Sequence, residues 1–408
     1  MPVGYLWTVG VVAVGTLCAL APVRRPRPLA ELSFRLGLVV GELPFLALAW
    51  LALWTAVAFT QGDVDAPAGR AAVALAALTA AGLVLVIRRG LRGRAVIDDA
   101  LAEGLGADWR AATAPGVTPG GKGRLARTLL WPFPHRPRDV VRVADLPYGP
   151  AGRRQRLDVY HHRARPSGAP VLIHLHGGGY RGGRKNSQSL PLLHRFARRG
   201  WVCVSADYRL RPEVRHPEHL IDAKRVIAWV REHGHAYGAD PATLFVAGSS
   251  AGAHLAALAA LTPGAPALQP GFETADTSVT AVIALNGYYG PYFGQGPESS
   301  PSAHITADAP PFLLVHGDRD TVVPVTAARR FAADLRDASV ATVVYAELPG
   351  AQHAFDLFHS PRFEAVVDGA EAFAHWVIAS PGPRRVRRPP CWRRTGRPAG
   401  SPSPAAPP

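Results

Sequence analysis

Residues 243–261 read TLFVAGSSAGAHLAALAAL, and this stretch joins two kinds of secondary structure through a single turn. Its apolar start, TLFVA, is typical of a buried strand, and its Ala- and Leu-rich end favours a helix. Between them Gly248 and Gly252 flank Ser249 and Ser250 in the pattern G-x-S-x-G. Such a sharp turn brings backbone close to backbone, which requires the glycines, and it leaves the second serine at the tip. We therefore expect the Ser250 hydroxyl to be a nucleophile beside the positive end of the following helix.

The chain around this turn alternates between short apolar runs and amphipathic stretches. Eight runs predict strands at residues 139–144, 156–160, 170–175, 201–206, 243–247, 279–285, 311–316 and 342–347. Four stretches predict helices at residues 217–233, 251–261, 325–337 and 364–378. Strands that are apolar throughout and alternate with helices indicate a mostly parallel sheet covered on both faces, which is an α/β fold. The first strands follow one another without helices, so we expect that edge of the sheet to be antiparallel.

A serine nucleophile needs an imidazole base, which a carboxylate in turn orients. On a sheet of this kind the expected chain order is Ser, acid, His. His353 follows the last predicted strand and is the only histidine between residues 320 and 358, so we expect it to be the base. Asp318 and Asp320 both follow the strand before it, at the sheet edge where open α/β folds place their sites. From position alone, one is the acid and the other structures the turn.

A glycine-rich segment, His176-Gly177-Gly178-Gly179-Tyr180, follows the third predicted strand. Glycines let the backbone approach a substrate and direct amide N–H groups at one of its oxygens. We expect the N–H groups of Gly178, Gly179 and Ala251 to form an oxyanion hole, with a plain glycine-rich turn as the alternative. We expect His176 to brace this loop by hydrogen bonding instead of transferring protons.

Taken together, the motifs resemble those of the α/β-hydrolase superfamily, in particular bacterial carboxylesterases similar to the hormone-sensitive-lipase and feruloyl-esterase-like groups. The matching segments are residues 176–179, 207–213, 248–255, 316–324 and 353–355. The resemblance implies an α/β-hydrolase fold that cleaves carboxylic esters through an acyl-enzyme intermediate. It also implies a Ser250–Asp320–His353 triad, because the acid in such turns is usually the second Asp. The chain departs from the G-D-S-A-G-G pattern of hormone-sensitive-lipase-like members, since it has Ser249 and Ala253 there.

This interpretation needs no cofactor and no metal, and its partner is a small-molecule ester. An arylformamidase-like amide hydrolase is one alternative, and a catalytically silent, membrane-bound hydrolase-fold binding protein is another. Four aromatic residues, Tyr288, Tyr289, Tyr292 and Phe293, follow the sixth predicted strand. They form either a small flap over an acyl pocket or ordinary packing.

Three apolar runs precede the predicted domain, at residues 3–22, 37–60 and 71–87. Each is long enough to cross a bilayer, where the backbone must satisfy its own hydrogen bonds, so we expect about three transmembrane helices. A cleaved signal peptide over residues 1–22 is the alternative for the first run. Glu42 has no partner nearby in the sequence, so we expect its carboxylate to reach the membrane interface, with an ion or proton site as the alternative.

Basic residues predict how these helices are oriented. Four Arg follow the first run, one Arg and two Asp follow the second, and four Arg follow the third. The positive-inside rule then places the catalytic domain in the cytoplasm. We therefore expect a multi-pass protein of the cell membrane, with the lipid bilayer as a partner.

The predicted organisation is a membrane anchor at 1–94, a linker at 95–138 with a candidate short helix at 96–105, a catalytic domain at 139–380 and a disordered Pro/Arg-rich tail at 381–408. The net charge of +15 is concentrated at the ends, with +5 in residues 1–95 and +7 in the tail. Because the catalytic domain is nearly neutral, we expect no nucleic-acid partner. The three cysteines lie far apart and have no metal-site spacing.

Overall fold

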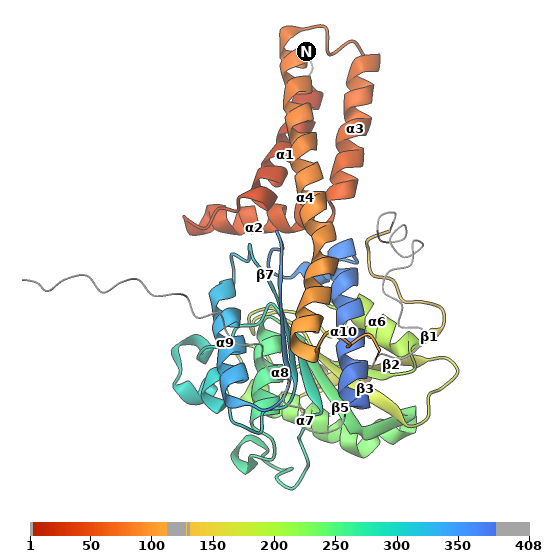
Figure 1. The fold of residues 1–408 in the computed structure, drawn as a ribbon, viewed down its shortest axis with the longest axis vertical. Coiled ribbons are helices and arrows are strands. Elements are labelled where there is room, and N and C mark those ends of the chain that lie inside the picture. The colour runs from red at the N-terminus through yellow and green to blue at the C-terminus, as the bar shows by residue number, and fades with distance from the viewer. Residues whose placement is uncertain (1–2, 112–127, 129–130, 381–408) are drawn as a thin grey trace, which may run out of the picture.

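An eight-stranded sheet forms the centre of the lower part of the molecule in the computed structural model (Figure 1), which describes residues 3–111, 128 and 131–380. Its strand order is β1-β2-β4-β3-β5-β6-β7-β8. The strands are β1 (Val140–Pro147), β2 (Arg156–His162), β3 (Ala169–Leu175), β4 (Val202–Ala206), β5 (Ala239–Ser249), β6 (Ala281–Leu285), β7 (Phe312–Gly317) and β8 (Val343–Leu348). All pairs from β4 to β8 are parallel, whereas β2 pairs antiparallel with both β1 and β4. The predicted α/β fold with one antiparallel edge is confirmed.

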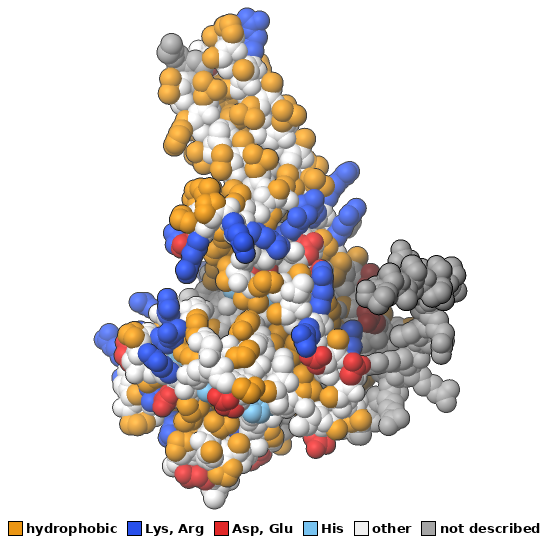
Figure 2. Space-filling view, turned by 90° about the vertical axis from the view of Figure 1, so that its left-hand side faces the viewer, with side chains coloured by type: hydrophobic (Ala, Val, Ile, Leu, Met, Phe, Trp, Pro, Cys, Tyr) orange, Lys and Arg blue, Asp and Glu red, His pale blue; other side chains and the backbone are white. Residues whose placement is uncertain are grey.

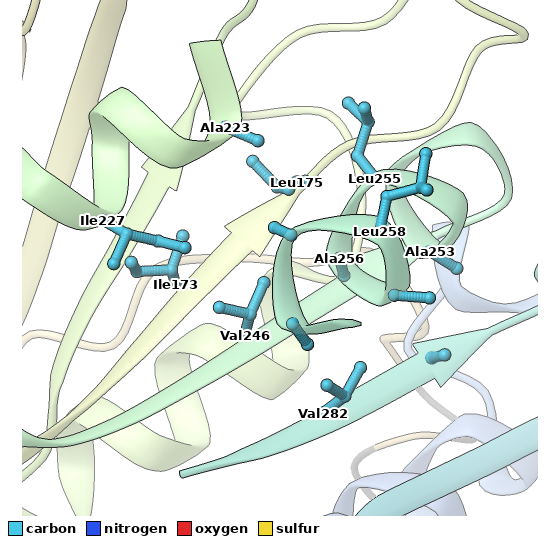
Figure 3. Packing of buried hydrophobic residues seen from close by; sticks show 14 of the residues in the cluster. Ile173, Leu175, Ala223, Ile227, Val246, Ala253, Leu255, Ala256, Leu258 and Val282 are labelled. Atoms are coloured by element: carbon cyan, nitrogen blue, oxygen red, sulfur yellow. The ribbon is translucent and has the colours of Figure 1, made fainter. Parts of the chain in front are cut away.

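Helices cover both faces of this sheet. The first face is covered by α7 (Glu218–His233), α8 (Ala251–Leu261) and α9 (Val325–Ala338), and the second by α6 (Leu190–Arg198), α10 (Pro361–Ala379) and the end of α4 (Pro67–Leu105). Helix α6 was absent from the sequence-based expectations. Figure 3 shows how α8 lies over the central strands, and its Ala256 and Leu258 belong to the same core cluster as Val246 of β5 and Val282 of β6. All eleven residues of α8 are buried, as expected of a helix that is apolar all round.

The N-terminal helices form an apolar shaft above the sheet (Figures 1 and 2). Helices α1 (Val3–Leu20), α3 (Pro44–Thr60) and α4 make up the shaft, and α2 (Arg27–Glu42) lies across its base. Among the described residues, α1 and α4 are long and apolar enough to cross a membrane, and α2 with α3 adds a third span if the bent pair is counted as one. These helices associate the protein with a membrane.

The predicted single helix over residues 37–60 is wrong. The chain breaks at Leu43, and α2 and α3 meet at an angle of 87°. Pro44 begins α3, and because a proline lacks the backbone N–H and restricts the residue before it, it favours a new helix over a continuous one.

The predicted linker also differs from the structure, because residues 95–105 continue α4. This helix runs for 39 residues, from the apolar shaft down to the catalytic body. Ile97, Leu101 and Leu105 are buried in the same core cluster as side chains of α10 and β8. Arg94 donates a hydrogen bond to Asp368 of α10 over 2.5 Å. The Gly/Pro-rich part of the linker and the tail at 381–408 lie outside the described residues.

Candidate active site

Ser250 lies at the turn between β5 and α8, as the sequence pattern predicts. Its backbone has φ 55° and ψ −117°, a conformation that non-glycine residues rarely adopt and that is found at functional sites. The flanking glycines are required by close approach. A Cβ on Gly248 would lie 2.2 Å from the carbonyl oxygen of Gly252, and one on Gly252 would lie 2.0 Å from that of Leu175. The turn therefore accepts no side chain at either position without rearrangement.

Three predicted residues meet at the carboxyl ends of β5, β7 and β8. His353 Nε2 lies 2.9 Å from Ser250 Oγ, and His353 Nδ1 lies 2.7 Å from Asp320 Oδ2. The other oxygen of Asp320 accepts hydrogen bonds from the N–H groups of Val322 and Val323, at 2.8 and 2.7 Å. These contacts hold the carboxylate in place, so that it can accept a hydrogen bond from the Nδ1–H of His353 while Nε2 faces the serine hydroxyl.

The electrostatics keep this carboxylate ionised. Burial alone would raise the pKa of Asp320, but His353 and His316 more than offset that effect and hold the pKa below its ordinary value. His316 Nε2 lies 3.2 Å from Asp320 Oδ2. Asp318, the other candidate, instead accepts a hydrogen bond from the Gly350 N–H at 2.7 Å, and burial raises its pKa.

The glycine-rich loop after β3 borders the nucleophile. A Cβ on Gly177 would lie 3.1 Å from Ser250 Cβ, and Gly178 has φ +121°, which favours glycine. Among the described residues, the N–H groups of Gly178, Gly179 and Ala251 donate in none of the backbone hydrogen bonds outside helices and strands. These groups are therefore candidate donors to an oxygen bound beside Ser250.

His176 is buried and takes no part in the Ser250 contacts. Its ring stacks on Tyr208, with ring centroids 4.4 Å apart, and the Tyr208 hydroxyl donates to the His176 carbonyl at 2.7 Å. Burial lowers the pKa of His176. These contacts fit the bracing role that the sequence suggested.

A second buried carboxylate, which the sequence patterns did not indicate, contacts the residue before the nucleophile. Asp356 Oδ2 accepts hydrogen bonds from the hydroxyls of Ser249 (2.6 Å) and Ser189 (2.5 Å). Its Oδ1 accepts from Gln188 Nε2 at 3.0 Å, and Gln188 Oε1 accepts from the Gly177 N–H at 2.8 Å. The network joins the residue before Ser250 to the glycine-rich loop. The only sequence signal is the position of Asp356 three residues after His353.

The aromatic segment after β6 divides into packed and exposed residues. Tyr289 stacks on Phe331 with centroids 4.1 Å apart, and Tyr292 is buried with its hydroxyl 2.9 Å from His219 Nε2. Of the two alternatives, ordinary packing describes these two tyrosines, which are buried in the interior. Tyr288 and Phe293 are exposed.

Among the described residues no group of three or more His, Cys, Asp or Glu side chains is arranged to hold a metal ion. What the site can do with its own side chains is activate a hydroxyl and stabilise negative charge on an oxygen, which is the chemistry of acyl transfer.

Comparisons with known proteins agree with this chemistry. The BD-FAE family model matches residues 157–292. The probable carboxylic ester hydrolase LipM of Mycobacterium tuberculosis is 37% identical over 422 residues, covering 92% of this chain and 96% of its own. Esterase LipQ of the same organism is 42% identical over 269 residues, covering 59% of this chain and 64% of its own. A truncated carbohydrate esterase from gut microbiota shares the fold, with a TM-score of 0.50, 20% identity and coverage of 58% of this chain and 99% of its own. The chain therefore belongs to the carboxylic ester hydrolases of the α/β-hydrolase superfamily.

Proposed function

We propose that this ester hydrolase uses Ser250 as its nucleophile, His353 as its general base and Asp320 as the orienting acid. The observation that carries the proposal is a pair of contacts. The imidazole of His353 lies 2.9 Å from the serine hydroxyl on one side and 2.7 Å from the Asp320 carboxylate on the other. Asp318 is not assigned this role because its carboxylate is occupied by the Gly350 N–H.

The reaction then proceeds by two acyl transfers. Ser250 Oγ attacks the ester carbonyl while His353 Nε2 takes its proton, and the Asp320 carboxylate stabilises the imidazolium that forms. The N–H groups of Gly178, Gly179 and Ala251 stabilise the negative oxygen, helped by the N-terminal end of α8. His353 then protonates the leaving alcohol. Water attacks the acyl-enzyme by the same route in reverse and frees the carboxylic acid.

The test compares Ser250→Ala with the wild type, using full-length protein in detergent and p-nitrophenyl butyrate as substrate. Loss of the nucleophile lowers kcat by at least about a thousandfold. The matched control is Ser278→Ala, because Ser278 is exposed and precedes β6 at the opposite edge of the sheet. Undiminished hydrolysis by the Ser250 variant would end the proposal.

Two further measurements address the alternatives. A fluorophosphonate probe labels an activated serine, so labelling of wild type and not of Ser250→Ala separates an enzyme from a silent binding protein. A panel of matched esters and formamides then separates an esterase from an amide hydrolase. We expect turnover of the esters to exceed that of the formamides.

We also propose that the catalytic body faces the cytoplasm. Exposed Arg24, Arg25, Arg27, Arg88 and Arg92 all lie at the end of the shaft nearest that body, and Figure 2 shows basic side chains gathered there. Alkaline phosphatase fused after residue 380 should be inactive in cells, and green fluorescent protein at the same position should fluoresce. The reverse pattern would place the body outside.

A further inference from the structure

The carboxyl edge of the sheet, which holds the proposed relay, is turned toward the membrane helices and not away from them (Figure 1). A Cβ on Gly350, in the loop that carries His353, would lie 3.1 Å from Cδ of Arg89 on α4. The ring of Phe34 on α2 lies 6.3 Å from the ring of His353. Helix α2 therefore borders the site directly.

Helix α2 has the surface of a helix that lies along a membrane. Leu29, Leu32, Leu36 and Val39 are spaced by three and four residues, so they form one stripe along the helix. Leu29 and Leu32 are 54% and 52% exposed, which is unusual for leucines in a well-packed helix. An apolar stripe on a helix that also carries charged residues is typical of interfacial helices. The stripe lies at the base of the shaft, where the membrane-spanning candidates α1 and α4 leave the bilayer, so a lipid surface is the apolar phase it would meet.

The charges around α2 fit the same environment. Arg24, Arg25, Arg27, Arg35, Arg88 and Arg92 are exposed near the base of the shaft. Of these, Arg35 pairs with Glu31 on the same helix at 2.6 Å. A band of arginines at this level favours contact with anionic lipid headgroups.

Contacts of α2 with α10 and with α1 fix the position of the active site relative to the membrane helices. The last residue of α2, Glu42, accepts hydrogen bonds from Arg362 and, at 2.6 Å, from Ser360 at the start of α10. On α1, the Cys18 carbonyl approaches Gly37 so closely that a Cβ there would lie 2.9 Å away. Since α4 passes unbroken from shaft to body, the catalytic residues cannot swing far from the membrane surface.

We infer that the active site opens onto the bilayer surface beside α2, and that its substrates are amphiphilic esters that reside in the membrane and reach Ser250 along this helix. This inference rests on the proposed function, because it assigns a substrate class and an access route to the same site. Phe34 forms the wall of the route nearest His353.

The test uses full-length protein reconstituted in vesicles of phosphatidylcholine and phosphatidylglycerol. Activity is measured on 4-methylumbelliferyl oleate dissolved in the bilayer and on p-nitrophenyl butyrate in water, and the ratio of the two is compared among variants. We expect Leu29→Ser/Leu32→Ser to lower this ratio about tenfold, because it removes two apolar contacts with lipid. The matched control is Val340→Ser, an exposed apolar residue that precedes β8 at the far edge of the sheet, and it should leave the ratio unchanged.

An unchanged ratio in the leucine variant would overturn the inference, and so would an equal loss on both substrates. A second readout needs no catalysis. An environment-sensitive fluorophore on Leu32→Cys, in a background with Cys18 and Cys391 replaced by Ser, should be blue-shifted and shielded from aqueous iodide. The same fluorophore on Val340→Cys should be quenched, and equal quenching at both positions would also overturn the inference. Failure of the proposed function is recognised separately, as hydrolysis that survives Ser250→Ala.

Discussion

Replacing Glu42 by Leu should destabilise the full-length protein strongly, although this residue lies at the end of α2 and far in sequence from the catalytic body. The Glu42 and Arg362 side chains are only 1% and 2% exposed, and they pair with each other. A guanidinium cannot lose its proton in a protein, so Glu42→Leu leaves a buried charge without a counter-charge. Breaking a buried pair in this way costs about 3–5 kcal/mol.

The double variant Glu42→Leu/Arg362→Met separates the lost charge pairing from lost packing. It removes both charges and keeps comparable volume, so the main penalty disappears. What remains is the Ser360 hydroxyl without its acceptor, which costs about 1–2 kcal/mol. We therefore expect the double variant to be more stable than Glu42→Leu alone.

Thermal unfolding in detergent, followed by tryptophan fluorescence, measures both variants. At about 2 °C per kcal/mol for a chain of this size, Glu42→Leu should lower Tm by roughly 6–10 °C and the double variant by about 2–4 °C. A double variant that unfolds at or below the temperature of Glu42→Leu would refute the reasoning, since the unpaired guanidinium would then not be the cause.

Three other changes test the site and its surroundings. Asp320→Asn should lower kcat on p-nitrophenyl butyrate about 10³–10⁴-fold because the imidazole loses its orienting charge, whereas Asp318→Asn should change it less than about threefold; equal losses would contradict the assignment. Asp356→Ala should lower the free energy of unfolding by about 2–4 kcal/mol in chemical denaturation, because the buried hydroxyl and amide groups that donate to Asp356 lose their acceptor. A change below about 1 kcal/mol would contradict the hydrogen-bond network around Asp356. Burial lowers the pKa of His254 to about 4 in the fold, against about 6.5 when unfolded, so the unfolded chain takes up the proton first. The stability that the neutral His254 contributes is therefore complete above about pH 6.5. It is lost as the pH falls toward 4, by about 3 kcal/mol at most. The Tm of His254→Gln should therefore fall less steeply with decreasing pH than that of the wild type, and an unchanged slope would count against the burial argument.

Much of the fold could be predicted from the sequence because it depends on local patterns. The inner strands β4, β6 and β7 are short, mainly apolar runs that are buried along their whole length, and runs of that kind favour the centre of a sheet. Helix α6 was missed because it is only nine residues long, and its N-cap, Ser189, makes no capping hydrogen bond and has φ 52°. The short helix expected at 96–105 is the end of α4, and its continuity with the third apolar run was missed because the arginines after residue 87 were interpreted as the end of a membrane helix.

The site was predictable to the level of candidate residues. Sequence order and turn position single out Ser250 and His353, since each motif lies within a few residues of a strand end. Position along the chain left Asp318 and Asp320 open, and the family resemblance favoured Asp320. In the fold the two carboxylates start in the same turn and diverge, one to the Gly350 N–H and the other to His353. Asp356 was missed for the same reason: its partners Ser249 and Gln188 come from two other loops.

What the sequence determined by itself was the chemistry available and the class of scaffold, because periodicity and turn motifs act over a few neighbouring residues. The tertiary structure alone decided how membrane helices and catalytic body meet. Glu42 seemed to lack a partner along the chain, yet it lies against Arg362, 320 residues away. Phe34 of α2 likewise lies beside His353, although the two residues are 319 positions apart in the sequence. Pairings at such separations depend on how the helices and the sheet pack, and no local pattern encodes them.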